Sequence, residues 1–89
     1  MGEQLTYNRV ILKSGSKYMA ICPELNISVD SDTTESAIKA LNLEVADFFG
    51  SAKKDKQLES LLEDAGYTHE QGGWVVPQLK ETGTDSVEV

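Results

Sequence analysis

The chain has 89 residues, of which 39% are hydrophobic and 26% charged, which is typical of one soluble globular domain with a single modest core. Its uncharged runs are far shorter than the roughly 20 apolar residues that span a bilayer, and no secretory signal pattern opens it, so a cytoplasmic protein is expected. Fifteen Asp and Glu against eight Lys and Arg give a net charge of −7, and Arg9 is the one arginine. This balance argues against direct nucleic-acid binding and suits a basic protein partner.

Three strands are predicted from runs of β-branched, aromatic and alternating apolar residues: Leu5–Leu12, Tyr18–Cys22 and Asn26–Ser31. Lys13–Ser16 is a turn cluster of suitable length for a hairpin loop. Pro23 cannot donate to a strand ladder, so regular pairing should stop or bulge there.

A long amphipathic helix is predicted next. Asp32 and Thr33 supply N-cap chemistry, and Glu35 places negative charge in the first turn. One apolar stripe then follows helical spacing, with Phe49 at its edge. Its members are Ala37, Ile38, Leu41, Val45 and Phe48. Gly50 is predicted to end this helix.

A shorter second helix is predicted over Asp55–Ala65, after a polar connection at Lys53–Asp55. Gly66 should cap its C-terminus, with Tyr67 making the accompanying hydrophobic contact. The segment from Tyr67 to Pro77 fits either a tight hairpin or a turn into one final strand.

These elements predict an α+β fold of two layers, with an antiparallel sheet in the order β-β-β-α-(α)-β. The apolar stripe from Ala37 to Phe48 is expected to cover one face of the sheet. Residues 1–79 form the single expected domain, and the polar tail 80–89 is expected to be disordered. Exposed sheet edges in so small a domain invite pairing with another copy.

No catalytic, cofactor-binding or metal-binding residues are predicted. With one Cys the chain cannot form an internal disulfide, and with one Cys and one His it cannot form a usual Cys/His zinc site by itself. Cys22 is interpreted as a buried small hydrophobe and His69 as a solvated loop residue, because they lie far apart in the sequence without an orienting group. Asp30-Ser31-Asp32 lacks the glycine and distal glutamate of a calcium loop, so Asp32 is interpreted as a helix cap. The acids of the second helix line its exposed side: Glu59, Glu63 and Asp64.

Two apolar residues are candidates for contacts with a partner. Leu43 falls on the far side of the first helix from the core stripe and, with Ala46, could form an oligomer or partner contact. Trp74 is interpreted as a core or dimer-interface residue in preference to a ligand platform.

Tyr18–Leu25 resembles the strand of the HicB antitoxin family that ends in Tyr-x-Ala-x-x-Pro-Asp/Glu-Leu. Asp32–Ile38 is similar to the Asp-Thr-x-x-Glu-Ala-Leu helix start of that family, and the likeness runs on to Phe48-Phe49. The chain departs from the pattern at Asn26–Ser28, where Pro-Gly-Cys is common, and at Ser31, where glycine is usual. It also has Ala40 and Leu43 where many members have Asn and Glu.

The resemblance implies a partial RNase H-like β-β-β-α-β fold without the nuclease carboxylates, and assembly into homodimers or larger oligomers. It also implies a partner, a small basic HicA-type mRNA interferase whose RNA-binding or catalytic surface the antitoxin covers. The segment after Phe49 has no basic recognition element, so a short member without a DNA-binding domain is expected. The alternative is an orphan HicB-like adaptor that assembles without a toxin. A metal-dependent nuclease using Glu24, Asp30 or Asp32 is disfavoured, because these carboxylates flank a turn without the spacing for a shared metal.

Overall fold

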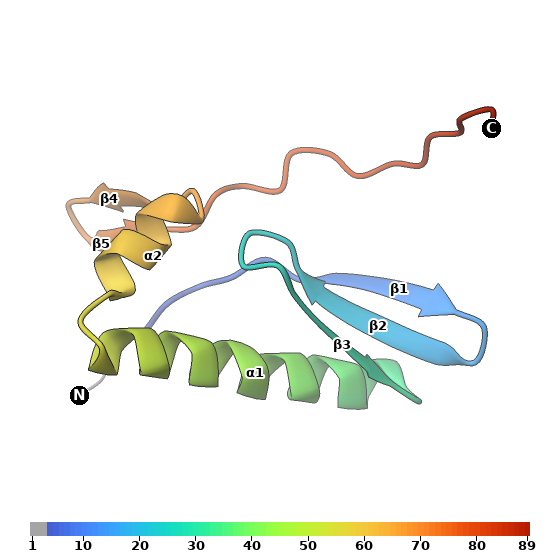
Figure 1. Cartoon of the computed structure of the whole chain (residues 1–89), viewed down its shortest axis with the longest axis horizontal. Coiled ribbons are helices and arrows are strands. Elements are labelled where there is room, and N and C mark those ends of the chain that lie inside the picture. The colour runs from blue at the N-terminus through green and yellow to red at the C-terminus, as the bar shows by residue number, and fades with distance from the viewer. Residues whose placement is uncertain (1–3) are drawn as a thin grey trace.

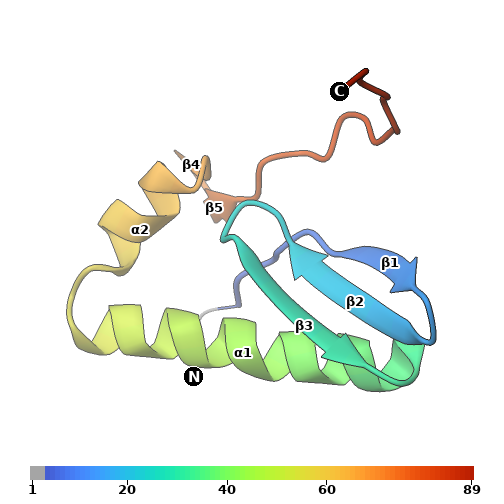
Figure 2. The same ribbon diagram turned by 45° about the vertical axis from the view of Figure 1, so that its right-hand side comes forward.

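The structure is a computed structural model that describes residues 4–89. A three-stranded sheet lies on one long helix, and a short helix and a small hairpin pack near the C-terminal end of that helix (Figures 1 and 2). In chain order the elements are β1 (Val10–Ser14), β2 (Lys17–Cys22), β3 (Ile27–Ser31), α1 (Thr34–Lys54), α2 (Leu58–Asp64), β4 (Thr68–Glu70) and β5 (Gly73–Val75). The α+β class and the antiparallel sheet of three strands followed by helices are confirmed.

The first strand begins five residues later than predicted. Leu5 and Tyr7 pack against the core without joining the sheet, so their apolar character reports burial and not strand pairing. At its other end β1 continues to Ser14, which pairs with Lys17. The turn is therefore only two residues long, and the positive φ of 62° at Gly15 is the one that a type II′ hairpin requires at its first central position.

The sheet is an antiparallel meander in the order β1-β2-β3. Alternate residues of β2, from Tyr18 through Ala20 to Cys22, face the core beneath the sheet. Ladder pairing stops before Pro23, as predicted, and Asn26 completes the turn with a φ of 56° and a bond from its N–H to the Pro23 carbonyl.

Helix α1 covers the inner face of the sheet through one row of buried residues: Ala37, Leu41, Val45, Phe49 and Ala52. Two details differ from the prediction. Phe49 is the buried aromatic of the pair, whereas Phe48 is 38% exposed at the edge. Gly50 does not end the helix, because the core-facing row continues one further turn to Ala52 and tertiary burial outweighs the intrinsic cost of a glycine.

The helix ends at Lys54 through a Schellman arrangement built without glycine. The Gln57 N–H binds the Ala52 carbonyl at 2.8 Å, and the Lys56 N–H binds the Lys53 carbonyl at 3.1 Å. Lys56 occupies the left-handed position that glycine usually fills, with a φ of 61°. Lysine at this position gave no local sign of a helix end, which is why the sequence pattern placed the stop too early.

Helix α2 is shorter than predicted, beginning at Leu58, but its end is confirmed in detail. The Tyr67 N–H binds the Leu62 carbonyl at 2.9 Å, the Gly66 N–H binds the Glu63 carbonyl, and Gly66 has a φ of 97°. Tyr67 is buried and packs edge-on against Phe49, with ring centroids 6.4 Å apart. This contact joins the end of α2 to α1.

The segment after Tyr67 is a hairpin, the first of the two predicted alternatives. β4 and β5 pair only with each other, so the expected final strand does not join the main sheet. From Val76 onwards the chain has no helix or strand, and it runs past the face of the sheet opposite α1 (Figures 1 and 2). Within the described residues 4–89, no helix combines the length and apolar character needed to cross a membrane.

Candidate interaction surface

Glu24, in the turn between β2 and β3, and Asn8, before β1, together join three distant segments of the chain. Its carboxylate accepts the backbone N–H of Asn8 at 2.7 Å and the Asn8 side-chain amide at 3.2 Å. The same amide donates to the Pro77 carbonyl at 2.6 Å, so the entry to β1 is tied both to this turn and to the start of the C-terminal tail. The buried Tyr67 hydroxyl adds a bond to the Thr6 carbonyl. Glu24 is therefore a positioning residue of the fold.

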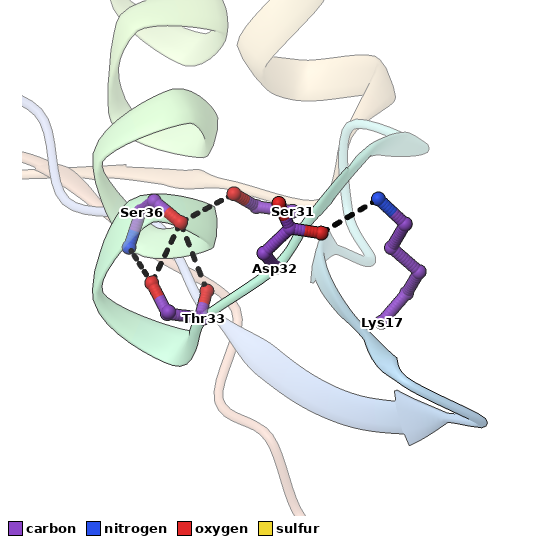
Figure 3. Close-up of polar contacts among 5 residues, drawn as sticks. All are labelled: Lys17, Ser31, Asp32, Thr33 and Ser36. Carbon is purple, nitrogen blue, oxygen red and sulfur yellow. Dashed lines mark hydrogen bonds and ion pairs between the residues drawn. The ribbon is translucent and has the colours of Figure 1, made fainter.

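The start of α1 is held by a cluster of hydroxyl groups (Figure 3). Thr33 is the N-cap: its hydroxyl accepts the Ser36 N–H at 3.1 Å, and Ser36 also contacts the Ser31 hydroxyl. The interpretation of Asp32 as a cap was wrong. Asp32 instead forms an exposed ion pair with Lys17 at 2.7 Å, and this hydrogen bond and charge lower the pKa of Asp32 and raise that of Lys17. The pair bridges β2 to the turn that precedes the helix.

The predicted environment of Cys22 is confirmed, and that of His69 in part. The Cys22 thiol is fully buried in the core, and burial is the main reason that its pKa rises to about 12, so it is a packing group and not a ready nucleophile. His69 is exposed, as predicted, but it lies in β4 and stacks on Trp74 with ring centroids 4.6 Å apart. Among residues 4–89, no hydrogen bond joins Cys22 to His69 and no three metal-ligating side chains gather at one point.

The outer face of the sheet is the largest feature that the sequence analysis missed. Strand register places four apolar side chains on the face opposite α1: Val10, Leu12, Met19 and Ile21. None of them belongs to the core or packs against it, and Leu12 is 49% exposed. The signal was present in the sequence, because the first two strands contain the unbroken apolar runs Val10–Leu12 and Tyr18–Cys22, and such runs indicate a strand that is apolar on both faces.

The charge of the protein is strongly divided. Between residues 4 and 23, which include β1 and β2, there are three cations and no acid, although the whole chain carries −7. These cations are Arg9, Lys13 and Lys17, all exposed. α2 has three acids and no cation, and all three are exposed as predicted, whereas the three acids of α1 are matched by three lysines. The protein therefore has a basic β1–β2 hairpin, an acidic α2 and an acidic tail.

A groove of about 340 Å³ lies between α1 and the segment that leads into β1. Its walls include Tyr7, Ala46 and Phe49, and the Asn42 side chain donates to the Tyr7 hydroxyl at 3.0 Å. Leu43, one helical step away, is 71% exposed as predicted, and its role in a partner contact stays a prediction. Trp74 packs against the core, in agreement with one of the two roles predicted for it.

Comparison of the chain with models of protein families, with curated proteins and with solved structures finds no match in any of the three.

Proposed function

We propose that this protein is a HicB-like antitoxin, which binds and neutralises a small basic HicA-type mRNA interferase. In this proposal its fold is a partial RNase H-like one. The three strands and α1 correspond to the first four elements of the implied β-β-β-α-β order. The final strand of that order has a counterpart only in the separate β4–β5 hairpin.

The observation that carries the proposal is the structural role of the residues in the HicB-like motif. Tyr18 and Ala20 face α1 from β2, and Leu25 packs against the core. Pro23 follows the last ladder pair, and Glu24 binds Asn8. Because these motif residues help to build the fold, their likeness to the HicB motif is a likeness in fold as well as in sequence. This supports the proposed HicB-like fold.

The distribution of charge supports the nature of the partner. A basic toxin would be steered toward the exposed acids of α2, away from the basic hairpin of β1 and β2. Occupying the cationic RNA-binding surface of such a toxin with carboxylates would block its substrate directly. Cys22, which is buried and protonated, supports a binding role over thiol chemistry.

The test is a pull-down from the native host with the full chain as bait, followed by mass spectrometry. We expect one small basic protein that arrests growth when expressed alone and is neutralised by co-expression of this chain. Recovery of the bait alone would refute the antitoxin proposal. It would favour the orphan adaptor, for which the uncovered outer face of the sheet is the specific support.

Charge variants locate the contact once a partner is found. Glu59→Lys with Glu63→Lys on α2 should slow association and weaken its dependence on salt, because exposed charges act mainly by steering. Glu81→Lys with Asp85→Lys makes the same change of charge in the tail and is the matched control. Equal effects of the two pairs would show that only net charge matters, not the α2 surface.

A further inference from the structure

Strand β1 is an open edge of the main sheet. The sheet order is β1-β2-β3, and within residues 4–89 no other strand pairs with the free side of β1. An unpaired edge presents backbone N–H and C=O groups that can accept another strand. The opposite edge, β3, carries Asp30 and is followed by Asp32, which would repel an acidic segment.

The two faces of β1 differ in chemistry. Val10 and Leu12 point to the outer, uncovered face of the sheet. On the other side, Lys13 lies with its ammonium group 5.8 Å above the ring of Tyr18, a residue that faces the core. Alternation along β1 places Ile11 on the same side as Lys13, and the exposed Arg9 lies directly before the strand. A strand that complements β1 must be apolar on one face and acidic on the other.

The C-terminal tail contains that pattern. Val87 and Val89 are both exposed, and Glu88 lies between them. From residue 78 to residue 89 the tail has one lysine and three acids, a net charge of −2. It is therefore complementary in charge to the basic hairpin.

We propose that β1 is the docking site for the Val87–Val89 strand of a second copy of this chain, exchanged reciprocally within a dimer. With Glu88 opposite Ile11, the two valines lie beside Val10 and Leu12 in either strand direction. Glu88 is then diagonal to Lys13, a separation that long side chains can bridge. The same pairing occurs twice in a two-fold dimer.

A second copy is the occupant because the tail of the same chain stands clear of its own sheet (Figures 1 and 2). The root of the tail is held at Pro77 by Asn8, beside the entry to β1, so each protomer offers its edge and its tail from the same side. Residues 78–86 then form a nine-residue linker that can cross to the partner. The exchange leaves the acids of α2 uncovered, and it does not depend on the antitoxin proposal.

Sedimentation velocity of the purified full chain between about 5 and 500 μM tests the dimer. We expect a concentration-dependent dimer whose dissociation constant rises at least about tenfold for Val87→Ser with Val89→Ser. Leu79→Ser, a change of an exposed apolar residue outside the docking strand, should leave it unchanged. A monomer at every concentration, or a dimer insensitive to the valine changes, would overturn the proposal.

Charge exchange tests the register. Glu88→Lys and Lys13→Glu should each weaken the dimer, and the two together should recover most of the loss, because the ion pair is re-formed in reverse. Glu81→Lys is the control for net charge. Purely additive losses in the double variant would overturn the proposed pairing.

Cross-linking distinguishes a second copy from the tail of the same chain. Leu12→Cys chains mixed with Val87→Cys chains or with Val89→Cys chains should form intermolecular disulfides on oxidation, with Val87→Cys if the strands are antiparallel and Val89→Cys if they are parallel, while buried Cys22 stays unreacted. If chains carrying both changes close on themselves and remain monomeric, the tail docks on its own sheet and the exchange is refuted.

Discussion

Replacement of Glu24 by alanine should destabilise the protein by about 2 kcal/mol. The carboxylate accepts two hydrogen bonds from Asn8, at 2.7 Å and 3.2 Å, and a bond to a charged group contributes about 1.5–3 kcal/mol. The longer bond is the weaker, and the site is only partly buried, so the sum lies toward the lower end. For a domain of this size the loss corresponds to a decrease in Tm of about 8–16 °C.

Urea unfolding followed by the fluorescence of Trp74, the single tryptophan, measures this change. Glu24→Gln keeps one acceptor but loses the charge, and should cost about 1 kcal/mol. In a double-mutant cycle with Asn8→Ala the losses should not add, because the side-chain bond is shared. Glu59→Ala, on the exposed face of α2, should change stability by less than about 0.5 kcal/mol. A Glu24→Ala protein as stable as the wild type would refute the role of this carboxylate in fastening the fold.

Other results are expected from experiments on Gly50, Lys56, Leu41 and Cys22. Gly50→Ala and Lys56→Gly should each stabilise the protein by about 0.5–1 kcal/mol in urea titrations. Gly50 is helical with open space around a new Cβ, and Lys56 has a left-handed φ that glycine adopts more readily. Destabilisation by either change would contradict the structure of α1 and its C-terminal end. Leu41→Ala should cost about 2–5 kcal/mol, since the side chain is fully buried, and a smaller loss would place Leu41 outside the core. Native Cys22 should react with a thiol reagent at pH 8 about a thousandfold more slowly than in urea, because its pKa is about 12 instead of 9 and only the thiolate reacts. The raised pKa also means that the stability from this thiol is present below pH 9 and is lost as the pH rises toward 12, so Cys22→Ala should flatten that loss in alkaline unfolding experiments.

The position of the helices and of most turns could be predicted because they depend on neighbours in the sequence. The apolar spacing of α1, its cap at Thr33 and the glycine end of α2 each involve residues within about four positions of one another. The stop at Pro23 follows from its own missing N–H. Such features need no knowledge of the rest of the chain.

Other features depend on contacts between distant segments. The rotation of α1 on the sheet decides whether Phe48 or Phe49 is buried. Packing of Ala52 against the core decides that α1 continues beyond Gly50. Local periodicity cannot resolve neighbours that differ by one helical step.

The outer face of the sheet and the hydrogen bonds of Glu24 could not be predicted from local sequence patterns either. In the sequence Val10 and Leu12 belong to one apolar run with Ile11, and only the strand register shows which of the three lie on the uncovered face. Glu24 meets Asn8 across 16 residues, and Asn8 meets Pro77 across 69. Sequence patterns describe which residues seek burial or a hydrogen bond, whereas the partner that satisfies each one is chosen when the whole chain closes around a single core.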